Sequence, residues 1–182
     1  MKKKDNHVLR LSFFGLKTHL QFHENMTREE KRLRVIQALI AQQQHIANVA
    51  QQEMDSAQQQ SNDYGANVDR YDSYRTKMMQ ARDMYAKQLS AANASLRFLD
   101  EALRMKPFDR AEHGAIVVTD KQRFFMSIGA GKFVVNDSES PTGMQYYFAI
   151  SAQTPIYLAI KGKNIGDSFI VNGMKQTIKE IL

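Results

Sequence analysis

The chain contains no cysteine. This absence excludes disulfide bonds, metal sites built on thiolates and a cysteine nucleophile. It is consistent with a reducing compartment, and we expect the protein to be cytoplasmic. No apolar run approaches the roughly 20 residues that a membrane-spanning helix needs. The basic and apolar residues 1–17 are interrupted by Arg10 and followed by no small-residue cleavage site, so we predict neither a signal peptide nor a membrane partner.

The motifs of self-contained enzymes are also missing. There is no Walker phosphate loop, no Rossmann glycine fingerprint, no His-Glu-x-x-His and no Gly-x-Ser-x-Gly. The run Gly129–Lys132 has neither the spacing nor the following helix of a phosphate loop, and we interpret it as a hairpin turn. His45 and His113 are isolated. We therefore expect that the chain is not an enzyme by itself and has no cofactor of its own, and that any chemistry requires groups donated to another protein's site.

Two long helical patterns occupy the first part of the chain. Thr27 and Glu30 have the spacing of a capping box, which predicts the start of the first helix. Apolar residues then recur at steps of three, four or seven, with Gln43 filling one gap: Leu33, Ile36, Ile40, Ala47, Ala50, Met54 and Ala57. The second pattern has similar steps: Met78, Tyr85, Leu89, Leu96, Leu99 and Leu103. Arms of about 35 residues, each about 50 Å long, joined by a short turn cluster at 61–67, predict an antiparallel coiled coil within one monomer. An intermolecular coiled coil is the alternative.

The pattern changes from helical to β at Pro107, which ends the second helix. We expect a linker at 107–113 and strands at 115–119, 123–128, 132–136, 145–150 and in a hairpin at 168–181 turning at Asn172-Gly173. Thr154 is expected to cap a short helix that Gly162 stops. The predicted fold class is α+β. A flexible extension (1–26) precedes a coiled coil (27–106, tip near 61–75), and an antiparallel sheet with one short helix (114–182) follows it.

Two acids, Asp69 and Asp72, lie between the helical patterns. If the return helix has begun there, their spacing puts them on one face, with Cβ atoms roughly 5–6 Å apart. One interpretation is that they cap the helix and interact favourably with its dipole. The other is that the hairpin carries a carboxylate pair to a site that a globular domain cannot reach. Both can hold, and Ser73, Tyr74 and Arg75 would then support the tip.

Charge is unevenly distributed along the helical part. Residues 35–69 contain four acids and no lysine or arginine, whereas residues 1–34 contain nine basic residues against four acids. The return segment after residue 74 is again basic. An acidic outer end on a basic stem suggests a partner with a nucleic-acid component and a metal component. A generic solvated helical surface gives the same pattern.

Several short stretches of the C-terminal part occur in a recognisable order. They are Ile150-Ser151, Thr154-Pro155, Ala159–Lys163 with Gly162, and Ile165–Asp167 with Gly166. This series resembles the signature that closes the Gre transcription elongation factors, and Gly114–Thr119 is similar to the family's first strand. The resemblance covers about residues 27–182. It implies an FKBP-like C-terminal domain behind an antiparallel coiled coil, with Ser151, Pro155, Gly162, Lys163, Gly166 and Asp167 mainly structural.

The resemblance also implies a function. Gre factors dock at the rim of the RNA polymerase secondary channel and insert the coiled coil toward the active site, reaching nascent RNA and DNA only through the elongation complex. Two tip acids help to hold a Mg²⁺ ion shared with polymerase, so that polymerase cleaves backtracked RNA. Asp69 and Asp72 match these acids in position and spacing. Here, however, the second acid is Asp rather than Glu, and the family's Asn-Ala-Glu run is missing. A non-cleaving channel regulator or inhibitor, and a coiled-coil interaction module outside transcription, are therefore the alternatives.

Overall fold

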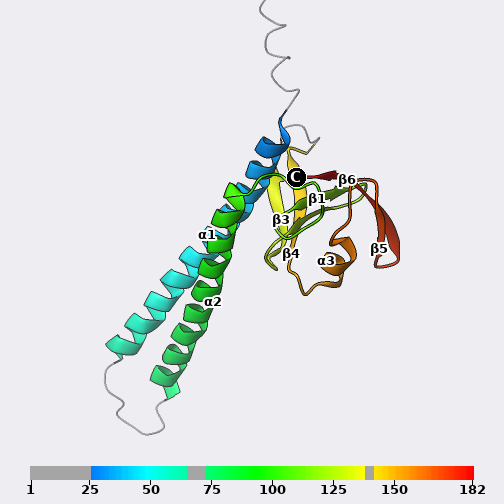
Figure 1. The fold of residues 1–182 in the computed structure, drawn as a ribbon. Coiled ribbons are helices and arrows are strands. Elements are labelled where there is room, and N and C mark those ends of the chain that lie inside the picture. The colour runs from blue at the N-terminus through cyan, green and yellow to red at the C-terminus, as the bar shows by residue number, and fades with distance from the viewer. Residues whose placement is uncertain (1–25, 65–72, 138–141) are drawn as a thin grey trace, which may run out of the picture.

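The computed structural model describes residues 26–64, 73–137 and 142–182. A long helical hairpin projects from a six-stranded mixed sheet, which makes the fold α+β (Figure 1). The elements are α1 (Arg28–Asp63), α2 (Ser73–Arg104), β1 (Ile116–Thr119), β2 (Arg123–Met126), β3 (Gly131–Asn136), β4 (Met144–Ile150), α3 (Pro155–Ile160), β5 (Ser168–Val171) and β6 (Met174–Ile181).

The predicted capping box at the start of α1 is confirmed. The Thr27 hydroxyl accepts a hydrogen bond from the backbone N–H of Glu30 at 3.2 Å, and the Glu30 carboxylate accepts one from the backbone N–H of Thr27 at 2.8 Å. The pKa of Glu30 is lowered, chiefly because its ionised form accepts this backbone hydrogen bond. The other end of α1 was predicted too early, because Ser61 is buried inside the helix and α1 continues to Asp63.

The two long helices pack along their length, and small side chains line much of the contact. The buried residues of the outer part of α1 are Gln43, Ala47, Ala50, Ala57 and Ser61, and those of α2 are Ala92, Leu99 and Ala102. Small side chains let two helix backbones approach closely. Near the base the buried face of α1 is wider than predicted, since Val35 and Leu39 are also buried. The reason is that this part of α1 packs against both α2 and the sheet.

The sheet has the strand order β3-β4-β2-β1-β6-β5. The prediction that it is antiparallel was wrong, because β2 and β4 run parallel, with Phe124 opposite Phe148. The prediction of a hairpin turn at Gly129–Lys132 was also wrong, because the two strands that this run joins, β2 and β3, are not neighbours in the sheet. β4 folds back from β3 and lies between them, beside β2. β3 runs opposite to β2 and β4 runs opposite to β3, so β4 has the same direction as β2.

Other local predictions for the sheet region are confirmed. The side chain of Thr154 caps α3, Pro155 is its first residue, and Gly162 follows it with a φ of +78°. The β5–β6 hairpin turns through Asn172 and Gly173, whose φ angles are +50° and +75°. Successive positive φ angles are typical of the tight turns that join antiparallel strands, and Asn-Gly adopts them at little cost.

The base of the hairpin and one face of the sheet share a hydrophobic core. Buried residues of α1 and α2, such as Ile36 and Leu99, lie in one cluster with Phe125, Phe133 and Leu182. A second cluster on the other face includes Tyr157 and Ile160 of α3 together with Phe124 and Ile178. Each large apolar side chain that is fully buried contributes roughly 1.5–3 kcal/mol. The shared cluster therefore holds the hairpin against the sheet.

A buried arginine reinforces this junction. Arg32 of α1 is 1% exposed and donates hydrogen bonds to the backbone oxygens of Gly114 at 2.7 Å, Ala102 at 3.0 Å and Leu182 at 3.3 Å. Its guanidinium carbon lies 5.2 Å from the centre of the Phe108 ring. Burial lowers the pKa of Arg32, and these backbone oxygens partly replace the lost water. One side chain thus connects both helices, the segment before β1 and the end of the chain.

No helix in the three described ranges combines the length and the apolar character that crossing a bilayer requires.

We predict that Arg32→Ala lowers the free energy of unfolding by roughly 2–4 kcal/mol, because it leaves a cavity and removes the donor from buried backbone oxygens. Arg97→Ala is the matched control, since Arg97 is exposed on α2 and its removal should change stability by no more than about 0.5 kcal/mol. Urea unfolding followed by circular dichroism measures both variants. Equal unfolding free energies for the two variants would contradict the role given to Arg32.

Candidate functional site

The end of the hairpin farthest from the sheet is closed by an aromatic pair. Tyr64 follows α1 and Tyr74 lies in the first turn of α2, and their ring centres are 4.8 Å apart. The Tyr74 hydroxyl donates a hydrogen bond to the side-chain oxygen of Gln60 at 3.3 Å. The pair brings the end of α1 next to the start of α2. Asp69 and Asp72 belong to that segment and lie outside the described residues.

The predicted supporting residues Ser73, Tyr74 and Arg75 form the start of α2. Ser73 and Tyr74 are exposed, and Arg75 is half-buried. A little further along α2, Arg82 donates a hydrogen bond to the side chain of Gln58 on α1 at 2.9 Å. Polar and aromatic contacts between the helices therefore continue up to the last described residues of the tip.

The helices of the hairpin differ in charge. Along α1 beyond Arg34 the charged side chains are the exposed acids Glu53, Asp55 and Asp63. The outer half of α2 is mainly basic, with Arg75, Lys77, Arg82 and Lys87. Because the helices lie side by side, acidic and basic surfaces run next to each other toward the tip. The expected contrast between an acidic end and a basic stem thus becomes, in space, a contrast between two neighbouring helices.

Residues of the C-terminal signature hold the chain around α3. The backbone oxygen of Ser151 accepts hydrogen bonds from the N–H and the hydroxyl of Thr154, at 3.0 and 2.8 Å, just before Pro155. Gly162 donates its N–H to the oxygen of Ala111, and the oxygen of Lys163 accepts the N–H of Ala111 in return.

The end of the signature holds the chain in the same way. Gly166 donates its N–H to the backbone oxygen of Ile178, and the Asp167 carboxylate accepts the backbone N–H of Asn164 at 2.8 Å. The Gly166 bond ties the loop after α3 to β6, and the Asp167 bond closes that loop on itself.

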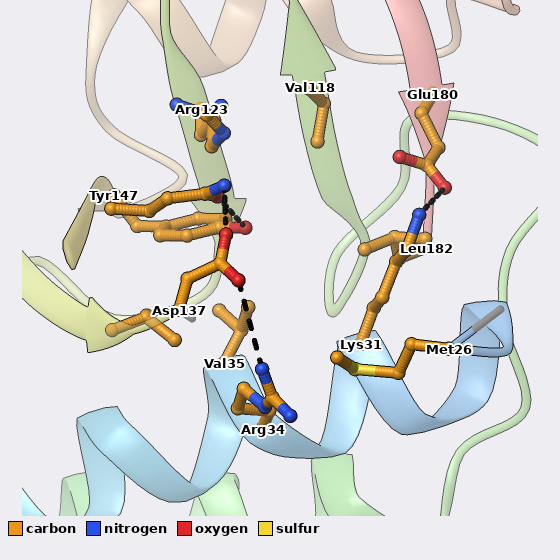
Figure 2. A pocket seen from close by; sticks show the side chains of 12 residues that line it. Met26, Lys31, Arg34, Val35, Val118, Arg123, Asp137, Tyr147, Glu180 and Leu182 are labelled. Atoms are coloured by element: carbon orange, nitrogen blue, oxygen red, sulfur yellow. Dashed lines mark hydrogen bonds and ion pairs between the residues drawn. The ribbon is translucent and has the colours of Figure 1, made fainter. Parts of the chain in front are cut away.

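A second candidate site, which no motif of the sequence indicates, lies between α1 and the sheet. It is a cavity of about 140 Å³ (Figure 2). Strand registers explain how its sheet wall forms: Val118 of β1 lies opposite Arg123 of β2 on one side and Glu180 of β6 on the other. Tyr147 of β4 continues this row, because Arg123 and Tyr147 each precede the parallel pair Phe124–Phe148. Cross-strand neighbours project from one face of a sheet.

Charged side chains from α1 meet this row. Lys31 lies 3.5 Å from the Glu180 carboxylate, and Arg34 lies 3.9 Å from that of Asp137. The side chain of Asp137 also accepts a hydrogen bond from the Gln145 amide. The Tyr147 hydroxyl in turn donates to the Gln145 side-chain oxygen at 3.3 Å. The cavity is therefore bordered by two separate polar groups, the pair Lys31–Glu180 and the series Arg34, Asp137, Gln145 and Tyr147.

Arg123 and Tyr147 face each other at one wall of the cavity. The guanidinium carbon of Arg123 lies 5.9 Å from the centre of the Tyr147 ring. The pKa of Tyr147 is raised, first because the ring is buried and also because of the carboxylates of Asp137 and Glu180. The cations Arg123 and Arg34 oppose this increase. Tyr147 is thus neutral over a wider pH range in the folded protein than in the unfolded chain.

Within the described ranges, no three or more histidine, aspartate or glutamate side chains gather into a group that could hold a metal ion. Comparisons with protein families, with curated proteins and with solved structures gave no match for this chain.

The raised pKa of Tyr147 predicts a stability loss at alkaline pH. Above pH about 10 the unfolded chain releases the tyrosine proton while the folded protein retains it, so the free energy of unfolding falls as the pH rises. Tyr147→Phe should make this fall shallower between pH 9 and 11, after a loss of about 1 kcal/mol at neutral pH from the missing hydrogen bond. The exposed neighbour gives the control Tyr146→Phe, which should keep the original slope. Urea unfolding at each pH measures the slopes, and equal slopes for the two variants would refute this assignment.

Proposed function

We propose that this protein is a Gre-like accessory factor of RNA polymerase. Its hairpin enters the secondary channel, and Asp69 and Asp72 at the tip stimulate polymerase to cleave backtracked RNA. The observation that carries the proposal is the long hairpin, which ends at the acid-bearing segment 65–72 and begins at a sheet region whose sequence resembles that of Gre factors. We interpret the hairpin as an antiparallel coiled coil and the sheet region as FKBP-like.

The dimensions of the hairpin support this role. The 36 residues of α1 span about 54 Å at 1.5 Å per residue. The shared core and Arg32 hold the base of the hairpin against the sheet, and the pair Tyr64–Tyr74 closes its far end. The ends of α1 and α2 that flank residues 65–72 are thereby held at a defined distance from the sheet. Docking of the sheet region at the channel rim would then determine how far the tip reaches.

The side chains at the tip suit the proposed chemistry. Two carboxylates fit a hard divalent cation such as Mg²⁺, which takes one or two protein ligands and keeps several waters. Asp69 and Asp72 would hold such an ion jointly with polymerase, and a bound divalent cation supplies an activated water for phosphodiester cleavage. The chain itself positions the acids, and polymerase remains the nuclease. Nascent RNA and DNA are reached only inside the elongation complex, in the cytoplasm, by one copy of the chain.

A specific feature favours a second candidate function. The second acid is Asp72 rather than glutamate, and the Asn-Ala-Glu run typical of Gre tips is missing. An acid that is one methylene shorter reaches less far. A regulator that occupies the channel without promoting cleavage would tolerate this change.

A transcript-cleavage assay tests the proposal. Stalled, backtracked complexes of the cognate polymerase are incubated with Mg²⁺ and the protein, and release of short 3′ RNA fragments is followed over time. We expect the protein to accelerate release and the double variant Asp69→Asn/Asp72→Asn to return it to the rate of polymerase alone, because asparagine still caps a helix but carries no charge. Asp63→Asn is the matched control, since it removes an exposed acid near the tip from α1 and should retain full activity.

A competition assay for binding at the polymerase secondary channel distinguishes the remaining outcomes. Channel binding by a wild-type chain that does not accelerate cleavage would support the non-cleaving regulator. A chain that does not bind polymerase at all would overturn both candidate functions, leaving the coiled-coil interaction module.

A further inference from the structure

We propose that the cavity between α1 and the sheet binds a small organic anion, namely a carboxylate or phosphate attached to an apolar body no larger than one ring. The cavity is lined by Lys31 and Arg34 from α1 and by Arg123, Tyr147 and Glu180 from the sheet (Figure 2). The proposal is independent of any role in transcription, because the cavity lies at the base of the hairpin, away from the tip.

The balance of charges favours an anion. Lys31 is paired with Glu180, and Arg34 is paired with Asp137. Both carboxylates that line the cavity therefore already have a cation. Within the described part of the chain, Arg123 makes neither an ion pair nor a side-chain hydrogen bond. Its guanidinium instead lies against the Tyr147 ring. A guanidinium offers several N–H donors in a planar fork that matches a carboxylate or a phosphate.

The size and the walls of the cavity define the rest of the ligand. Its volume of about 140 Å³ is close to that of an engineered protein cavity of about 150 Å³ that binds benzene. Val35, Val118, Val135 and Leu182 supply apolar surface between the charged groups. Inorganic phosphate would satisfy Arg123 but would leave these walls in contact with water. A ring or a short alkyl group that carries the anion satisfies both parts.

Binding at this place would affect the hairpin. The cavity has one wall from α1 and the other from β1, β2, β3, β4 and β6, so a ligand inside it contacts both parts of the molecule. A ligand that binds only the folded arrangement stabilises that arrangement by mass action. The occupied cavity would therefore hold the hairpin more firmly against the sheet.

NMR titration of the full chain with benzoate and with phenyl phosphate tests the proposal. We expect saturable shifts of the backbone amides of Val118, Arg123 and Tyr147, a dissociation constant on the order of 1 mM or lower, and a rise in Tm with ligand concentration. Arg123→Gln should weaken binding at least about tenfold, because it removes the cation that is not otherwise paired. The matched control Arg110→Gln removes an exposed arginine outside the cavity lining and should leave binding unchanged.

A second variant distinguishes the contribution of the cavity space to binding from the contribution of the Arg123 charge. Val118→Phe keeps Arg123 but fills the space between the walls, so it should abolish binding. Benzyl alcohol, which has a similar ring without the charge, should bind at least about tenfold more weakly than benzoate. The proposal is overturned if neither anion gives saturable shifts, if benzyl alcohol binds as well as benzoate, or if both cavity variants bind like the parent chain.

Discussion

The burial of Arg32 is the constraint on which the rest of the arrangement depends. A guanidinium that is withdrawn from water needs hydrogen-bond acceptors, and here they are the backbone oxygens of Ala102, Gly114 and Leu182. Those oxygens come from the end of α2, the start of the sheet region and the end of the chain. Movement of the hairpin away from the sheet would break the bonds to Gly114 and Leu182 and leave the buried guanidinium with fewer acceptors. The hairpin therefore has one favoured direction relative to the sheet.

This fixed direction connects the two candidate sites. The proposed function requires the tip to reach a distant site, so the direction of the hairpin relative to the sheet must be defined. The cavity beside Arg123 lies where α1 meets the sheet, so it borders the junction that defines this direction. Packing of small side chains such as Ala47 and Ala50 then keeps the two helices together beyond the junction.

Much of the fold could be predicted from the sequence, because local signals specify it. Thr27 and Glu30 mark a helix start, Thr154 and Pro155 mark another, and Asn172-Gly173 marks a turn, each through contacts within a few residues. The parallel pairing of β2 with β4 depends on strands far apart in the chain, so no local signal reveals it.

The lack of local signals for long-range pairing also explains why the cavity could not be predicted. The sheet wall of the cavity is a row of residues across four strands, and that row exists only in the observed register. Arg32 was missed because arginine is rarely fully buried, and nothing in its neighbourhood of the sequence identifies its three distant acceptors. Asp69 and Asp72, by contrast, lie close together in the sequence between two clear helical patterns.

The most direct test of this account measures whether the hairpin and the sheet form one rigid unit. Because the chain has no cysteine, Gln59→Cys near the outer end of α1 and Lys175→Cys on the β5–β6 hairpin allow two spin labels at exposed positions. Double electron–electron resonance then gives the distribution of distances between them. We expect a single narrow distribution. A broad distribution, or two separate ones, would contradict it, because the hairpin would then move freely relative to the sheet.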